Sequence, residues 1–145
     1  MMYKLKDLEN KLKHLHEDFK EISRFCTDTD GKKLVKYEPF LKEIIERGEF
    51  FDCRTRDDNY TLSMPFGRCH MNVAEVFSNG VDKEEDDIIY SGYALNSILE
   101  WFPHSWIVNK DGNIVETFSA LQVAYYGYAL DKFEEMAFIE YWIDK

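Results

Sequence analysis

Residues 104–118 read HSWIVNKDGNIVETF, and this stretch decides the fold of the chain. Two runs rich in β-branched and aromatic residues, 104–109 and 114–118, flank the tripeptide Lys110-Asp111-Gly112. Asp-Gly between two such runs is a strong signal for a β-hairpin. The sequence therefore predicts two neighbouring antiparallel strands, and the rest of the fold can be built outward from them.

The length of the hairpin loop determines which side chains share one face of the sheet. A two-residue loop would place Glu116 on the face opposite to His104. A three-residue loop that ends in a left-handed Gly112 places Glu116 opposite Trp106, which is the face of His104. Asp at the second loop position and Gly at the third favour the three-residue loop. We therefore expect His104 and Glu116 to be diagonal neighbours on one face.

The N-terminal third of the chain has the pattern of helices. Apolar residues recur every three or four positions over 3–26, which is typical of an amphipathic helix. Glu38 and Pro39 are typical of the first turn of a second helix, and Gly48 is typical of its end. The apolar stripe can pack on its own domain, or it can pair with a protein partner or a second copy of this chain.

Further elements are expected on both sides of the hairpin. Residues 88–95 and 125–130 are typical of strands. A loop delivers Cys69 to the start of a helix, and a capping box at Asp131 begins a last helix through Trp142.

The order of the elements predicts the fold class. The segment 50–66 is irregular and polar, and we interpret it as a surface loop or a short strand. Helices come first, strands follow, and a helix ends the chain, so we predict an α+β fold with an antiparallel sheet. A length of 145 residues corresponds to one domain. We expect a helical N-terminal part over 1–48 within the single domain 1–145.

Composition and charge exclude several classes of protein. Eighteen basic and 28 acidic residues give a formal net charge of −10, which repels a phosphate backbone, so we expect no nucleic-acid partner. No apolar run approaches the roughly 18 residues that a membrane span needs, so we expect no membrane partner. The three cysteines form no CxxC motif and are odd in number, which argues against a disulfide framework and predicts a reducing, cytoplasmic compartment.

Cys69, His104 and Glu116 form the candidate catalytic group. A helix N-terminus stabilises a cysteine thiolate, and its backbone N–H groups can hold an oxyanion. A histidine within hydrogen-bond reach takes the thiol proton and later returns it to the leaving group. A carboxylate fixes the imidazole tautomer and stabilises its charged form.

Two stretches of the sequence carry a resemblance to a known family. They are RCHMN at 68–72 and the block HSW…DG…VE over 104–116. A cysteine at a helix start, a strand with His-x-Trp and an acidic residue on the next strand resemble the transglutaminase-like and papain-like cysteine fold. The stretches also resemble small bacterial and phage proteins with a Cys-His-x-Asn motif. The resemblance covers 67–130 and implies a catalytic core there, with Glu where the fold usually has Asp or Asn.

Three neighbouring residues are candidates for substrate-binding or site-supporting roles. His70 is an alternative base, but adjacent residues on a helix point about 100° apart, so we rank it below His104. Asn72 can bridge the backbone near Cys69, or it can orient the site. Trp106 is either a wall of the same cleft or part of the core.

A metal site is not expected. A zinc site would need four converging ligands, and no pair among the cysteines and histidines has the spacing of a zinc knuckle. The four conceivable ligands are Cys53, Cys69, His70 and His104. We therefore predict neither a metal nor another cofactor.

Two functions are compatible with these observations. The first is a cysteine-dependent hydrolase or acyl transferase, which would attack an amide or thioester bond of a small-molecule or peptide substrate. The second is a non-catalytic, acidic binding or inhibitor protein of phage or mobile-element origin that blocks a basic partner. Catalysis predicts one hyper-reactive thiol, whereas the binding function predicts ordinary thiols and salt-sensitive association.

Overall fold

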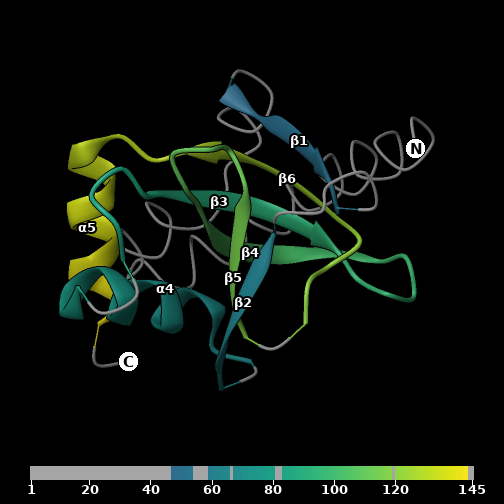
Figure 1. Ribbon diagram of the computed structural model, residues 1–145, viewed down its shortest axis with the longest axis horizontal. Coiled ribbons are helices and arrows are strands. Elements are labelled where there is room, and N and C mark those ends of the chain that lie inside the picture. The colour runs from purple at the N-terminus through teal and green to yellow at the C-terminus, as the bar shows by residue number, and fades with distance from the viewer. Residues whose placement is uncertain (1–46, 54–58, 66, 81–82, 119, 144–145) are drawn as a thin grey trace, which may run out of the picture.

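The computed structural model describes residues 47–53, 59–65, 67–80, 83–118 and 120–143. Six strands form one sheet in the order β1-β6-β3-β4-β5-β2, with two helices beside it (Figure 1). In chain order the elements are β1 (Glu49–Asp52), β2 (Tyr60–Met64), α4 (Cys69–Asn79), β3 (Ile88–Leu95), β4 (Trp101–Val108), β5 (Ile114–Phe118), β6 (Ala124–Ala129) and α5 (Lys132–Trp142). The expected helix over 3–26, and all but the end of the one from Glu38, lie outside the described residues.

The α+β class is confirmed, but the sheet is mixed rather than wholly antiparallel. Four neighbouring strand pairs are antiparallel, whereas β2 pairs in parallel with β5. The segment 50–66, which has no clear sequence pattern, contributes most of β1 and all of β2, one at each edge of the sheet. Edge strands are paired and buried on fewer sides, so their residues need not follow the pattern of a central strand.

The β4–β5 hairpin has the three-residue loop and the register that the sequence predicts. Asn109 N donates to Asn113 O at 3.0 Å, and Gly112 N donates to Asn109 O at 2.9 Å. Gly112 has a left-handed φ of 79°. Ile107 pairs with Val115, as this register requires. The candidate histidine and glutamate therefore share one face of the sheet.

The boundaries of two strands differ slightly from the predictions. Strand β4 begins at Trp101, which pairs with Leu95, so His104 lies inside the strand rather than at its start. The cause is β3, which offers a backbone partner along its whole length. Strand β6 begins and ends one residue earlier than expected. The last helix has the predicted capping box at Asp131 and ends at Trp142.

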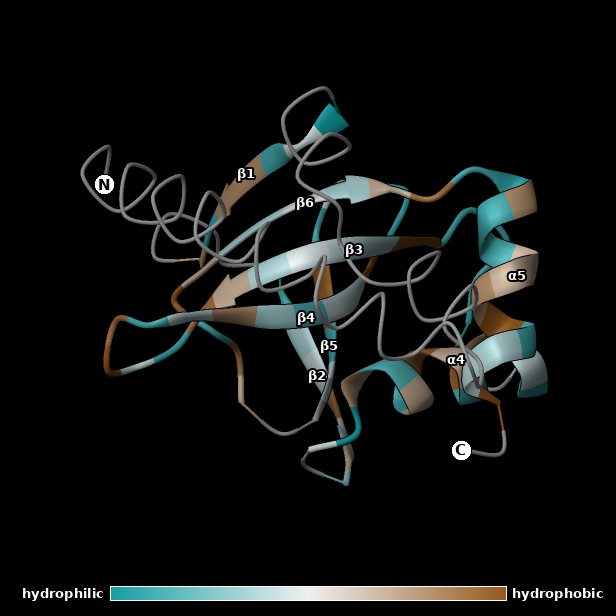
Figure 2. Cartoon of the chain, turned by 180° about the vertical axis from the view of Figure 1, so that it is seen from behind, coloured by the Kyte–Doolittle hydropathy of each residue, from teal (hydrophilic) through white to brown (hydrophobic). Residues whose placement is uncertain are grey.

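Helices α4 and α5 pack against each other and against one face of the sheet (Figure 1). Both helices carry hydrophobic and hydrophilic bands, as Figure 2 shows. Their apolar side chains form one buried cluster with the sheet, which includes Val73, Phe77, Ile89, Ile107, Val115 and Phe138. No helix among the described residues has the length and apolarity that crossing a membrane requires.

The opposite face of the sheet is concave. Tyr125 on β6 donates a hydrogen bond of 2.6 Å to Glu116 on β5, although β3 and β4 lie between these strands. Neighbouring strands lie about 4.8 Å apart, so a flat sheet would separate the two backbones by about 14 Å. The contact therefore requires strong curvature. Phe51, Tyr90 and Trp106 belong to the cluster that fills the concave side.

Two glycines meet at the centre of the sheet, and one of them, Gly127, makes room for Trp106. Gly92 and Gly127 are direct partners across β3 and β6. A Cβ atom on Gly127 would lie 2.6 Å from Trp106 Cη2 and 2.5 Å from Ser91 O. Because only glycine lacks this atom, it allows the indole to lie directly against the backbone. The packed indole stacks in turn on the His104 imidazole, at 6.1 Å between ring centroids and 19° between planes.

Candidate active site

Cys69 is the first residue of α4, as the sequence predicts. The preceding Gly67 has a φ of 82°, and Arg68 at the N-cap position makes no capping hydrogen bond with its side chain. The N–H groups in the first turn of a helix have no partner within the helix and carry partial positive charge. This end of α4 therefore favours a thiolate at Cys69 and offers donors to an oxyanion beside it.

Two histidines interact with the thiol of Cys69. Burial of the half-buried thiol opposes its ionisation. Interactions with His104 and His70 outweigh burial and lower the pKa of Cys69 to about 5. A thiolate is the nucleophilic form of cysteine, so this environment favours the nucleophilic form of Cys69 at neutral pH.

Glu116 holds the imidazole of His104 from the other side. His104 Nε2 donates to Glu116 Oε1 at 2.7 Å, and both side chains are fully buried. Burial alone would lower the pKa of His104, but the charge of Glu116 and the hydrogen bonds with Cys69 and Glu116 raise it to about 9. With Nε2 engaged by Glu116, Nδ1 is the ring nitrogen left to face the thiol. The structure thus brings the three predicted catalytic residues together, with a hydrogen bond from His104 to Glu116 and the Cys69 thiol close enough to His104 to interact with it.

Donors surround the buried carboxylate of Glu116. Besides the imidazole, the Tyr125 hydroxyl donates to Oε1 at 2.6 Å and Thr117 N donates to Oε2 at 3.0 Å. The Tyr125 oxygen itself accepts from Gln122 N at 3.1 Å. Burial and the charge of Glu116 raise the pKa of Tyr125, so its phenol stays protonated and remains a donor. Both carboxylate oxygens of Glu116 are therefore hydrogen-bonded, as a buried carboxyl group requires.

His70 is fixed on the helix-covered side of the sheet. Successive residues of a strand point to opposite faces, and Ser105 places its Oγ 2.7 Å from His70 Nδ1. The Ser105 hydroxyl donates in turn to Ser91 Oγ at 3.5 Å. The His70 ring stacks on Trp142 of α5, with 4.6 Å between centroids and 23° between planes. His70 and His104 therefore approach the thiol from two separately anchored positions.

Asn72 and Trp106 support the site from behind. The buried Asn72 donates through Nδ2 to Pro65 O at 2.8 Å, which ties α4 to the segment before it. This contact favours the backbone-bridging role over a direct role at the thiol. Trp106 is fully buried and stacks on His104, so it belongs to the core and not to a cleft wall.

A cavity of about 620 Å³ opens beside Cys69 and His104. Its other lining residues are Gly67 before α4 and residues from the connection between β3 and β4, from the start of β4 and from 120–123. Small-molecule sites in proteins typically occupy about 300–1,000 Å³. The thiol and the imidazole therefore face a space of the size that a substrate needs.

A metal centre is not formed within the described ranges. No group of three or more His, Cys, Asp or Glu side chains lies there in an arrangement that could hold a metal ion. The conceivable zinc site is thus not assembled there, and Cys53 and Cys69 form no disulfide with each other.

Sequence reasoning did not find the roles of Tyr125, Ser105 and Trp142. Tyr125 meets Glu116 only because the sheet curves, and no hairpin pattern links two strands that are not neighbours. Ser105 lies in the predicted strand, directly after the predicted histidine, so strand alternation could have placed it opposite α4. Nothing in the sequence indicates that α5 delivers Trp142 to His70.

Comparison with known proteins gives no relatives for this chain. No family model matches the sequence, and no curated protein or solved structure has a significant match to it. The function proposed below therefore depends on the geometry of the site.

Proposed function

We propose that the protein is a cysteine-dependent hydrolase or acyl transferase that acts on the amide or thioester bond of a small-molecule or peptide substrate. One observation carries this proposal. Cys69 at a helix N-terminus interacts with His104, whose Nε2 hydrogen-bonds the buried Glu116, and the cysteine and the histidine line one cavity. Nucleophilic catalysis requires such a nucleophile, a base beside it and a group that orients the base.

The first half of the reaction forms an acyl-enzyme. The Cys69 thiolate attacks the carbonyl carbon, a C–S bond forms, and the N–H groups at the start of α4 stabilise the oxyanion. The bond from the carbonyl carbon to the leaving amine or thiol then breaks. His104, protonated beside the thiolate, gives its proton to the leaving group. Glu116 keeps the imidazole in place and stabilises its charge.

The second half releases the acyl group. The neutral His104 takes a proton from water or from an acceptor amine or alcohol, and that oxygen or nitrogen attacks the thioester carbon. The C–S bond breaks and the Cys69 thiolate returns. Water as the acceptor gives hydrolysis, and another nucleophile gives acyl transfer. A free thiol of low pKa functions in a reducing compartment, which supports a cytoplasmic location.

The resemblance noted in the sequence supports the same class. A helix-borne cysteine next to a strand-borne histidine, with an acidic residue on the neighbouring strand, matches what the transglutaminase-like and papain-like fold implies. The glutamate takes the position of the usual Asp or Asn, and its longer side chain suits the diagonal position that the hairpin register gives it.

Covalent acylation by an activated ester tests this proposal. Incubation with p-nitrophenyl acetate should add one acetyl group to Cys69, seen by intact-protein and peptide mass spectrometry, with a burst of p-nitrophenol. Cys69→Ala should abolish the burst, whereas Cys53→Ala, which removes the other described thiol, should retain it. Equal, slow acylation of both cysteines at the rate of free glutathione would overturn the proposal. It would leave the non-catalytic binding function as the better account.

A further inference from the structure

The cavity beside Cys69 has an apolar wall. Phe102 and Pro103 at the start of β4 form one part of it, and Leu121 and Val123 form another. These four side chains come from two segments that are far apart in the sequence. Cys69 and His104 lie on the same lining, so a group bound against this wall would be next to the reacting atoms.

The polar groups of the cavity are uncharged. Asn96, Ser97 and Gln122 provide amide and hydroxyl groups. Apart from the reacting cysteine and histidine, no ionisable side chain occurs among the described lining residues. Charged residues make up 32% of the sequence, so their exclusion from this lining distinguishes the cavity from the rest of the surface. Away from the reacting pair of Cys69 and His104, an ion bound here would lose water and gain no partner of opposite charge from the described lining.

The cavity suits the acyl group of the substrate better than the leaving group. During the reaction the acyl group stays bonded to Cys69 Sγ, while the leaving group departs. The space that lies directly at the thiol must therefore hold the part that remains. Burial of an apolar acyl chain also favours reaction by removing its surface from water.

We propose that this cavity selects substrates whose acyl group is uncharged and mainly apolar, such as a medium-length acyl chain or the acyl side of an apolar amino-acid residue. The inference rests on the proposed cysteine chemistry and names the substrate class of the same site. Asn96, Ser97 and Gln122 then offer hydrogen bonds to a polar group within an otherwise apolar substrate.

Three p-nitrophenyl esters test the selectivity. Acetate is the short reference, hexanoate adds an apolar chain, and the mono-ester of adipic acid has the same six carbons with a terminal carboxylate. The rate of Cys69 acylation is measured for each ester and divided by the rate for glutathione. One methylene in an apolar pocket changes a rate about tenfold or more, so we expect at least about tenfold preference for hexanoate over both other esters.

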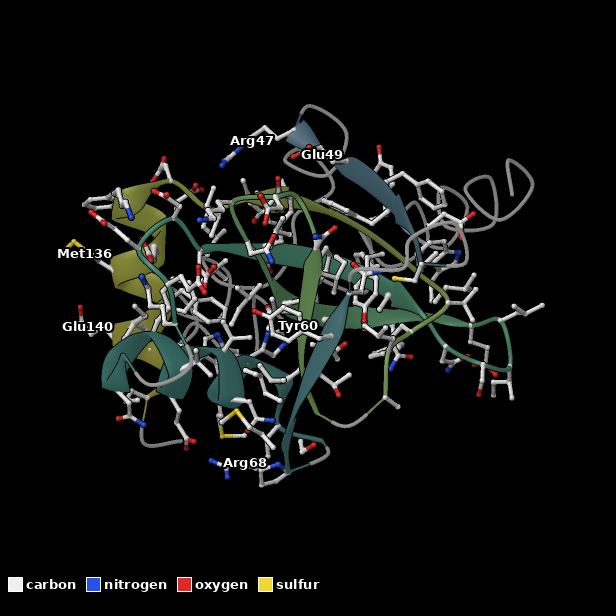
Figure 3. All side chains as sticks on the ribbon, in the orientation of Figure 1. Arg47, Glu49, Tyr60, Arg68, Met136 and Glu140 are labelled. Atoms are coloured by element: carbon white, nitrogen blue, oxygen red, sulfur yellow. The ribbon has the colours of Figure 1, made fainter. Side chains whose placement is uncertain are left out.

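Variants assign any preference to the cavity wall. Leu121→Asp places a charge on the lining at a residue that is 38% exposed, so the fold should tolerate it. It should reduce the hexanoate preference by about tenfold. Met136→Asp makes the same type of change at a 70% exposed position on α5, where the side chain points away from the sheet (Figure 3), and it should leave the preference unchanged.

The outcomes separate the two proposals. If all three esters acylate Cys69 at similar glutathione-corrected rates, or if the adipate ester reacts fastest, the acyl selectivity is wrong while the cysteine chemistry stands. If none of the esters acylates Cys69 faster than glutathione reacts, the cysteine chemistry itself is wrong, and the acyl selectivity falls with it.

Discussion

Glu116 is the residue on which the charge state of the site depends. Its carboxylate is fully buried and is the charge that favours the protonated form of His104. That protonated imidazole in turn stabilises the Cys69 thiolate. A single buried side chain therefore controls a thiol that it does not touch.

Glu116→Gln should slow alkylation of Cys69 at pH 6 by about tenfold or more. Loss of the charge lowers the pKa of His104 and raises that of Cys69, and a rise of the Cys69 pKa from about 5 to about 7 lowers the thiolate fraction at pH 6 about tenfold. The side-chain amide nitrogen introduced by this substitution would also face Thr117 N or the Tyr125 hydroxyl, and these groups are donors like the amide itself. Iodoacetamide labelling followed by peptide mass spectrometry measures the rate. Glu75→Gln on the surface of α4 is the control, and an equal effect there would contradict this role of Glu116.

Tyr125→Phe should act mainly on stability. The variant removes one donor to Glu116 and leaves the Gln122 N–H without its acceptor. A buried group that loses its partner costs about 1–3 kcal/mol, measured as the free energy of unfolding in urea. Tyr126→Phe, at the neighbouring half-buried tyrosine, should change stability by less than about 0.5 kcal/mol. Equal losses in the two variants would show that the Tyr125 hydroxyl has no special role.

At the scale of elements, strands β3 and β6 have a pair of facing residues where neither strand has room for a side chain. Gly92 and Gly127 meet there, and the Trp106 indole lies over Gly127. This close approach holds the indole against the face of the His104 ring. The packing of the central strands therefore contributes to the position of the base.

Gly127→Ala should destabilise the protein by about 1–3 kcal/mol, because the added methyl group overpacks a site with no free space. The displaced indole should also slow acylation of Cys69. Gly112→Asn is the control, since Gly112 has open space and asparagine tolerates a left-handed turn position. Urea unfolding measures both variants. If Gly127→Ala lowered the free energy of unfolding no more than Gly112→Asn does, the close packing at Gly127 would be contradicted.

The elements also show how far the sequence could predict this structure. The Asp-Gly turn was enough to determine the hairpin register, and with it the shared face of His104 and Glu116. The helix start at Cys69 and the capping box of α5 follow from local residues. The parallel pairing of β2 with β5 could not be predicted, because it joins segments about 55 residues apart through non-local contacts. The cavity wall could not be predicted either, because the order of strands in the sheet brings its two separate segments together.

At the scale of the whole molecule, three parts of the fold converge on one thiol. Helix α4 brings Cys69 and His70, β4 brings His104, and β5 brings Glu116. The curved sheet adds the support of β6 from behind, and α5 adds a stacking partner on the other side. The molecule has a net charge of −10, yet uncharged residues line the described cavity beside the thiol. The charges of the protein thus lie mainly outside the place where we expect substrate to bind.

The most direct test of the account is the alkylation rate of Cys69 against pH in the folded protein. The pKa of about 5 means that the thiolate is present above pH 5 and is lost as the pH falls through that value. We predict a midpoint near pH 5 for Cys69, and a shift toward the free-thiol value of about 8.5 in His104→Ala. Cys53 in the same sample serves as the internal reference. A Cys69 midpoint near 8.5 in the unmodified protein, unchanged by His104→Ala, would contradict the thiolate–imidazolium pair.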